Sequence, residues 1–168
     1  MNRFTSFLFA LLMAFVFTPD GMAKAKDFTV GKNTFLIGGK PIVIKAAEIH
    51  YPRIPREYWE HRMKMCKALG MNTVCIYIFW NIHEQKEGQF DFTGNNDIAA
   101  FCRLAQKNDL YVIVRPGPYV CAEWEMGGLP WWLLKKKDIR LREKDPYFME
   151  RVEIFEKKVA EQLAPLAI

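Results

Sequence analysis

The chain has 168 residues, of which 51% are hydrophobic and 14% aromatic, so it is long enough to bury a core. Its formal net charge is only +5 and its basic residues are interleaved with acidic ones, which gives no support for a nucleic-acid-binding protein. The four cysteines form no C-x-x-C pair and have no His at ligand spacing, so no metal site is expected.

The N-terminus has the pattern of a targeting signal. Arg3 supplies a positive start, and residues 7–17 form an almost unbroken apolar run. This run is too short to span a bilayer, which needs roughly 20 apolar residues. Small residues at Ala23 and Ala25 follow a helix-breaking turn, as expected for a cleaved signal peptide. We therefore expect export to a periplasmic or extracellular destination without a stable membrane anchor, a signal peptide over 1–25 and a single domain over 26–168.

Short strand-like runs open the remaining chain. Runs at 28–30, 34–37 and 41–44 are separated by glycine-containing turns, which predicts a small β-hairpin. A mostly buried strand is expected over 42–49. A helix is expected over 55–69, because one of its faces is apolar and Gly70 follows its end; that face carries Trp59, Met63 and Cys66.

Two further strand–helix pairs follow. Strands are expected over 73–79 (TVCIYIF) and 110–114 (LYVIV), both apolar throughout. A helix is expected over 97–107, with Ile98, Phe101, Cys102 and Ala105 on one side. After a long loop rich in Gly and Pro, Asp145 is a predicted N-cap with Pro at the first helical position, opening a helix that runs to about Leu163.

The element order is β-α-β-α-β-α with continuously apolar strands, which is typical of a parallel sheet covered by helices. A doubly wound open sheet and a (β/α)₈ barrel both have this order. No Gly-x-Gly-x-x-Gly follows any strand, so the usual nucleotide-binding signature is missing. A barrel takes roughly 250 residues, and three β-α units are less than half of one. The chain is therefore expected to be incomplete.

Polar and aromatic side chains gather directly after each strand, at residues 48–51, 80–84 and 115–125. In parallel β/α folds the carboxyl ends of the strands form the functional site. Carboxylates and amides bind hydroxyl groups, and an indole ring packs against the apolar face of a pyranose. The pattern therefore favours a carbohydrate ligand.

Several of these residues have a structural alternative. Glu84 could bond N–H groups of its own loop, and Arg115 could simply pair with a carboxylate. For four others, packing or a buried hydrogen bond is the favoured interpretation: His50, His83, Trp131 and Trp132. Glu123, in a loop rich in Gly and Pro, is expected to contact a ligand.

Glu123 and Glu125 are not expected to be a catalytic pair. Glycosidases place two carboxyl groups about 5–5.5 Å or about 6.5–9.5 Å apart on opposite sides of the scissile bond. Two residues so close in one loop cannot easily flank a bond with one raised and one ordinary pKa.

Three segments together resemble glycoside hydrolase family 35. Residues 115–133 (RPGPYVCAEWEMGGLPWWL) resemble the loop after its third barrel strand, and 77–84 (YIFWNIHE) the segment after its second. Residues 48–55 (EIHYPRIP) are similar to its first strand end. The matches are long, ordered and correctly spaced, and they cover about residues 35–168.

The resemblance implies that the chain is the N-terminal part of a (β/α)₈ TIM barrel, preceded by the hairpin. It implies a retaining, exo-acting β-galactosidase that needs no cofactor and takes β-galactoside oligosaccharides or glycoconjugates. Tyr77, Ala122 and Glu123 would bind the terminal galactose, the alanine through its backbone. Asn81 and Glu84 would line or support the same pocket.

No catalytic residue is assigned within the chain. In this family the acid/base Glu follows the fourth strand and the nucleophile a later one, so both are expected beyond Ile168. The full gene product is then expected to be active, and this chain alone to be inactive and, with open sheet edges, poorly folded. Two alternatives stay open: an exo-β-glucosaminidase of the same fold, and a non-catalytic sugar-binding remnant.

Overall fold

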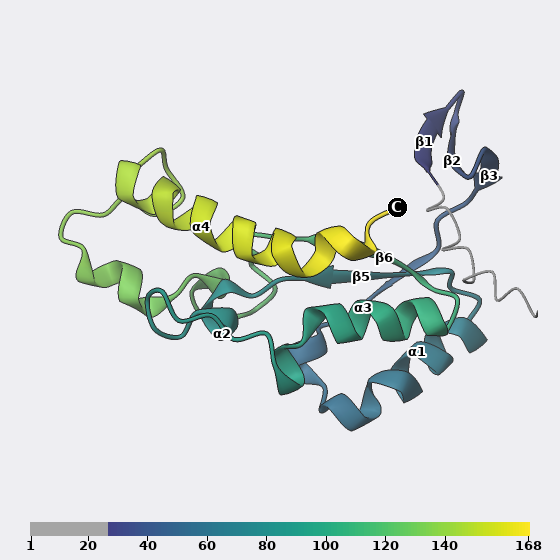
Figure 1. Cartoon of the computed structure of the whole chain (residues 1–168), viewed down its shortest axis with the longest axis horizontal. Helices are drawn as coiled ribbons and strands as arrows, with labels where there is room; N and C mark the ends of the chain where they lie inside the picture. Colours follow the sequence, from purple (N-terminus) through teal and green to yellow (C-terminus); the bar gives the residue numbers. More distant parts are fainter. Residues whose placement is uncertain (1–26) are drawn as a thin grey trace, which may run out of the picture.

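The computed structural model describes residues 27–168, which form two separate sheets and the helices that cover the larger one (Figure 1). The predicted signal peptide lies outside the described residues. Within this range, none of the helices is both long enough and apolar enough to cross a membrane.

The smaller sheet is a three-stranded antiparallel meander that projects from the rest of the molecule (Figure 1). Its strands are β1 (Phe28–Gly31), β2 (Thr34–Ile37) and β3 (Lys40–Ile42). Asn33 and Gly38 take left-handed backbone angles in its two tight turns, with φ of 60° and 57°. The predicted hairpin is therefore confirmed, and a third strand extends it.

The larger sheet is parallel, as predicted. Its order is β4 (Ala46–Glu48), β5 (Thr73–Tyr77) and β6 (Tyr111–Arg115), with β5 in the centre. The register pairs Glu48 with Cys75 and Tyr77 with Arg115. The carboxyl ends of the three strands therefore meet at one edge.

The predicted strand over 42–49 is wrong in its bounds, because β3 ends at Ile42 and β4 begins only at Ala46. The intervening backbone bonds to the Asn72 side chain, and it reaches β5 only at Lys45, whose carbonyl accepts from the N–H of Thr73 at 3.2 Å. Asn72 donates from Nδ2 to the carbonyl of Val43 (2.8 Å) and accepts from the N–H of Lys45 at Oδ1 (2.9 Å). This segment crosses from one sheet to the other, and the Val43 side chain is exposed.

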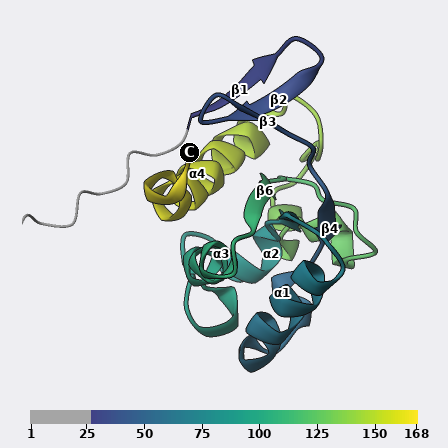
Figure 2. The same ribbon diagram turned by 90° about the vertical axis from the view of Figure 1, so that its right-hand side faces the viewer.

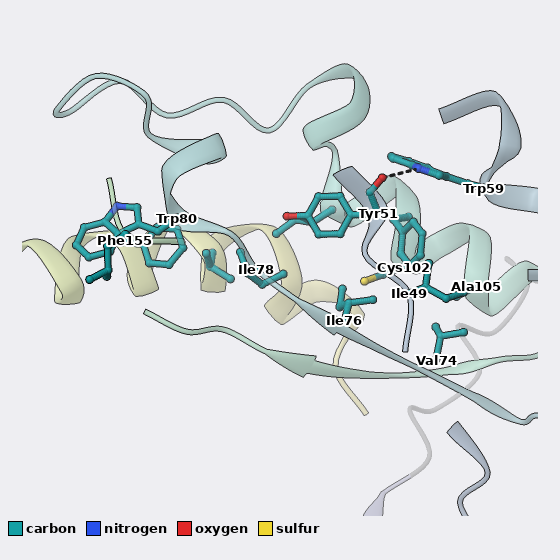
Figure 3. Packing of buried hydrophobic residues seen from close by; sticks show 14 of the residues in the cluster. Ile49, Tyr51, Trp59, Val74, Ile76, Ile78, Trp80, Cys102, Ala105 and Phe155 are labelled. Atoms are coloured by element: carbon teal, nitrogen blue, oxygen red, sulfur yellow. Dashed lines mark hydrogen bonds between the residues drawn. The ribbon is translucent and has the colours of Figure 1, made fainter. Parts of the chain in front are cut away.

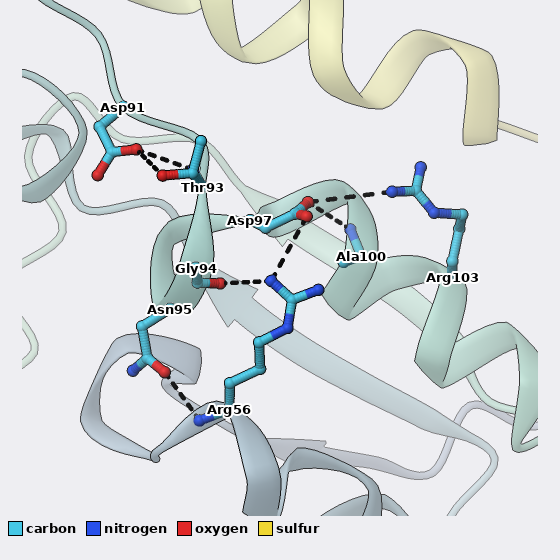
Figure 4. A network of polar contacts seen from close by, with 8 residues as sticks. All are labelled: Arg56, Asp91, Thr93, Gly94, Asn95, Asp97, Ala100 and Arg103. Atoms are coloured by element: carbon cyan, nitrogen blue, oxygen red, sulfur yellow. Dashed lines mark hydrogen bonds and ion pairs between the residues drawn. The ribbon is translucent and has the colours of Figure 1, made fainter.

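The three predicted helices are present as α1 (Trp59–Ala68), α3 (Ile98–Lys107) and α4 (Pro146–Leu163). Asp145 caps α4 as predicted by accepting from the N–H of Phe148 at 3.0 Å. Asp97 caps α3 by accepting from the N–H of Ala100 at 2.7 Å. Figure 4 shows that the same Asp97 carboxylate also faces Arg56, which fixes the start of α3 against the turn before α1.

One short helix and several single 3₁₀ turns were not predicted. The helix is α2 (Trp80–His83), directly after β5. The 3₁₀ turns are η1 (Tyr51–Arg53), η2 (Arg56–Tyr58), η3 (Gly94–Asn96), η4 (Glu125–Gly128), η5 (Trp131–Lys135) and η6 (Ala164–Leu166). They are too short to leave an apolar periodicity in the sequence.

The helices α1, α3 and α4 all lie on one side of the parallel sheet (Figure 2). Strand residues that face them, such as Val74 and Ile76, are fully buried. Alternate residues point to the other face, where Ile113 is 39% exposed. The prediction of a strand buried throughout is therefore wrong for β6, because no described element covers this second face.

The core lies between the sheet and these helices (Figure 3). Trp80 stacks on Phe155 of α4 with ring centroids 5.0 Å apart. At the other end, Trp59 meets Phe101 edge to face at 5.2 Å. The predicted apolar face of α1 is confirmed as part of this core, with Trp59, Met63 and Cys66 all buried.

Candidate functional site

The carboxyl ends of β4, β5 and β6 bring a polar cluster onto the uncovered face of the sheet. Arg115 lies 3.4 Å from Glu48, measured between Nη1 and Oε2, and its guanidinium sits 4.0 Å above the Tyr77 ring. His50 Nε2 is 3.0 Å from Glu48 Oε1. The alternative role of Arg115, pairing with a carboxylate, is therefore confirmed. Tyr77 is held at the strand end with its ring facing this open side.

The loop after β6 carries three successive residues in the left-handed region. The φ angles of Cys121, Ala122 and Glu123 are 60°, 52° and 46°. Non-glycine residues are strained there, and such strain concentrates at functional sites when the surroundings enforce it. The backbone N–H groups of Ala122 and Glu123 donate to no acceptor within residues 27–168. The turn therefore presents two free donors beside the Glu123 carboxylate.

Arg53, in η1 after β4, holds this turn in place. Its Nη2 donates to the carbonyl of Ala122 at 2.8 Å and to that of Glu123 at 3.0 Å. Its guanidinium also lies 4.8 Å from the centre of the Trp124 ring. The sequence prediction gave Arg53 no role. The only sequence signal for Arg53 was its place in the 48–55 segment. Its contact with Ala122 could not be predicted from local patterns, because the two residues are 69 positions apart.

The two glycines after the turn let the loop fold back on itself. A Cβ on Gly127 would lie 2.0 Å from Tyr119 Cε2, and one on Gly128 would lie 2.9 Å from Val120 Cγ2. Both glycines also have positive φ, at 59° and 89°. Only glycine therefore fits at this crossing, which fixes the end of the turn that carries Ala122 and Glu123.

Asn81 joins α2 to the same loop. Its Oδ1 accepts from Trp124 Nε1 at 3.0 Å, and the Trp124 ring packs on Phe79 with centroids 4.6 Å apart. Asn81 and Glu123 border a cleft of about 760 Å³. The structure therefore brings four predicted residues to neighbouring loops of one edge of the sheet: Tyr77, Asn81, Ala122 and Glu123.

Glu84 is placed differently from the other four predicted residues. It has no exposed surface, and both carboxylate oxygens accept hydrogen bonds from within the protein. One of the donors is the N–H of Gly88, at 2.7 Å, which is the structural alternative weighed from the sequence. Glu84 does not open on the cleft, because its carboxylate is turned into the core toward α4.

The histidines and tryptophans divide between the predicted roles. His83 is fully buried and Trp132 is 2% exposed, so the packing interpretation is confirmed for both. It is wrong for Trp131, which is 54% exposed. Successive side chains of a 3₁₀ turn point in different directions, so one of two adjacent tryptophans can be buried and the other exposed.

All four cysteines are free in the described structure. Cys66 and Cys102 are buried on helices, as expected, and burial raises the pKa of Cys102 to about 11. Within residues 27–168 no group of three or more His, Cys, Asp or Glu side chains could hold a metal ion.

Comparison with known proteins matches residues 34–168 to the family described as glycosyl hydrolases family 35. A β-galactosidase of Xanthomonas manihotis is 50% identical over 132 residues, which cover 79% of this chain and 22% of that relative. The β-galactosidase of Mus musculus is 44% identical over 135 residues, covering 80% and 21%. The chain thus spans about a fifth of the length of the curated relatives that it matches.

Solved structures with the same arrangement are far more distant in sequence. An exo-β-1,4-mannosidase from an Opitutaceae bacterium has a TM-score of 0.57 at 21% identity, covering 76% of this chain and 23% of its own. A GH5_18 protein from Bifidobacterium longum has a TM-score of 0.59 at 17% identity, covering 73% and 31%. These likenesses concern the fold alone, and they agree with the predicted N-terminal part of a (β/α)₈ barrel.

Three observations converge. The larger sheet is parallel with its strands in sequential order, as expected for part of a barrel, the residues after its strands meet at one edge, and the family match runs through all of these segments. The chain belongs to glycosyl hydrolases family 35.

Proposed function

We propose that the protein that contains this chain is a retaining β-galactosidase that removes terminal, non-reducing β-D-galactose from oligosaccharides or glycoconjugates. The observation that carries the proposal is the strained turn held by Arg53. It exposes the N–H of Ala122 and the carboxylate of Glu123 at the strand-end edge where glycosidases of this architecture work. Curated relatives at 44–50% identity, which bear the name β-galactosidase, support the same substrate.

Donors and acceptors at this edge suit a sugar. The free N–H of Ala122 can donate to a ring hydroxyl, and the Glu123 carboxylate can accept from two adjacent hydroxyls. Tyr77, held by the Arg115 guanidinium, adds a phenol at the end of β5. Asn81 and Glu84 support this edge through the contacts of α2 and its following loop. The catalytic acid and nucleophile are not assigned to Glu123 and Glu125, which lie two residues apart in one loop.

The direct test uses the longest in-frame product of the gene, called here the full gene product. Its two test substrates are nitrophenyl β-galactoside and nitrophenyl β-glucosaminide, here called the aryl β-galactoside and the aryl β-glucosaminide. We expect the protein to release nitrophenol from the first and not from the second. Retention is checked by observing the anomer formed first by NMR. Faster cleavage of the glucosaminide would favour the exo-β-glucosaminidase alternative. Galactose binding without turnover would favour a non-catalytic sugar-binding protein.

Glu123→Gln should lower kcat/KM for the aryl β-galactoside roughly tenfold. The amide keeps the shape but accepts at only one atom and loses the charge, and a hydrogen bond to a charged group is worth about 1.5–3 kcal/mol. Steady-state kinetics of the full gene product measure this effect. Glu143→Gln is the matched control, since Glu143 is exposed in another loop. An unchanged kcat/KM for Glu123→Gln would remove Glu123 from the binding site.

We also propose that residues 1–25 direct export, with cleavage near Ala23 or Ala25. The support is the positive start followed by a short apolar run. Expression of the full gene product in a secretion-competent host should give a mature protein that begins at one of the residues after these alanines, as read by N-terminal sequencing. An intact Met1 on the recovered protein would contradict the proposal.

A further inference from the structure

The cleft of about 760 Å³ lies beside the predicted galactose site rather than within it. It runs between α2, with the residues that follow it, and the loop that contains η4 and η5. Neither Tyr77 nor Ala122 lines it, but Asn81 and Glu123 do. The cleft therefore begins where the predicted galactose site ends.

Trp131 is the most exposed apolar surface of this cleft. The side chain is 54% exposed, whereas that of Trp132 is 2% exposed and donates a hydrogen bond to the carbonyl of Glu84. Lys135 covers one side of the Trp131 indole, with Nζ 4.6 Å from the ring centre. An exposed indole on a concave surface is typical of a binding site, because its burial by a ligand is favourable.

The polar side chains of the cleft carry both signs of charge. Gln85 and Lys86 lie on one wall, and Glu125 lies on the other. Together they supply donors and acceptors without a strong net charge, which suits a neutral ligand with many hydroxyl groups. An anionic ligand would meet the Glu125 carboxylate, and a cationic ligand the Lys86 ammonium.

We propose that this cleft binds the sugar units on the leaving-group side of the scissile galactoside, with Trp131 as the stacking surface. The inference rests on the proposed function and deepens it, because it names the substrate class as oligosaccharides with at least one sugar beyond the galactose. Asn81 and Glu123 belong to the predicted galactose site and also line the cleft. One oligosaccharide could therefore occupy both sites, with its galactose in the first and its next sugar in the cleft.

The test compares two substrates on the full gene product: methyl β-galactoside, which has no second ring, and a β-linked galactotriose. Trp131→Ala should lower kcat/KM for the trisaccharide about tenfold more than for the methyl galactoside, mainly through KM. Trp131→Phe keeps a flat ring, so its ratio of kcat/KM for the trisaccharide to kcat/KM for the methyl galactoside should return most of the way to that of the parent protein. An equal effect on both substrates, or none on either, would overturn the proposal.

Leu134→Ala is the matched control. Leu134 lies on the same 3₁₀ turn and is 58% exposed, but it does not line the cleft, so its removal should leave the ratio of the two kcat/KM values unchanged. If the parent protein cleaves neither galactoside, the proposed function fails while the cleft can still be tested. Quenching of tryptophan fluorescence by the trisaccharide in the parent protein, and its loss in Trp131→Ala, would then support a sugar site. Equal quenching in both proteins would overturn it.

Discussion

Replacing Glu84 with Gln should destabilise the loop after β5 by about 3–5 kcal/mol, which is the usual cost of removing one partner from a buried ion pair. Glu84 lies 2.5 Å from Nη2 of Arg151, whose side chain is only 13% exposed. Nε of Arg151 already has no hydrogen-bond partner in the described structure. Without the Glu84 charge, the buried Arg151 cation would keep only the longer pairing of its Nε with the half-exposed Glu87 carboxylate, at 3.7 Å.

The substitution also disturbs two neutral donors that point at the same carboxylate. Trp80 Nε1 donates to Oε2 at 2.6 Å and the N–H of Gly88 donates to Oε1 at 2.7 Å. A glutamine presents an NH₂ group to at least one of these donors, which leaves that donor unsatisfied. We therefore expect the loss of stability to be confined to the segment from α2 to Gly88 and to the facing part of α4.

Hydrogen–deuterium exchange of the full gene product measures this prediction segment by segment. Peptides covering 80–92 should exchange at least a hundredfold faster in Glu84→Gln, since 1.4 kcal/mol is a factor of ten. Glu153→Gln is the matched control, because Glu153 makes a hydrogen bond of 2.6 Å to Lys157 on the exposed side of α4. Exposed pairs contribute little. Equal protection in both variants would show that the buried pair does not hold the loop.

The sequence predicted the scaffold better than the site. Asp97 and Asp145 are recognisable helix starts because a cap depends on residues three positions away. The strand β5 is recognisable because its apolar run is central in the sheet. The bounds of the first strand were missed because Asn72, distant in sequence, bonds the backbone of residues 43–45.

Site details depend on contacts between distant segments, so local patterns could not reveal them. The burial of Glu84 depends on Arg151, 67 positions along the chain. The left-handed turn at Ala122 depends on Arg53. Convergence of the three strand ends was predictable, since parallel strands end at the same edge of a sheet. Which of the side chains there open on solvent was not.

His83 should make the folded state less stable in acid. The ring is fully buried, and this burial lowers the pKa of His83 from 6.5 to about 4. Its Nδ1 lies 2.8 Å from the carbonyl of Asp91, which can only accept, so Nδ1 carries the proton. Nε2 therefore accepts from the Tyr51 hydroxyl, at 2.5 Å. A second proton on the ring would leave Nε2 and that hydroxyl as two donors facing each other.

The sign follows from which state binds the proton. Between about pH 6.5 and 4 the unfolded chain protonates His83 and the folded protein does not, so the free energy of unfolding falls as the pH is lowered. The stabilisation is fully present above pH 6.5, and no further loss from this group occurs below about pH 4. A pKa difference of this size corresponds to a loss of roughly 3 kcal/mol across the window.

His83→Gln separates this effect from the general acid sensitivity of the protein. Glutamine can accept from Tyr51 and donate to Asp91 but does not titrate, so the variant should be less stable than the parent at pH 7.5 and approach it at pH 4.5. Denaturant titrations of the full gene product, followed by tryptophan fluorescence, measure the difference. His61→Gln is the control, because His61 is exposed on α1 and should leave the pH slope unchanged. Only a group whose pKa differs between the folded and unfolded states can change the slope of the unfolding free energy with pH. If this free energy has the same pH dependence in the parent and in His83→Gln, the acid sensitivity arises elsewhere.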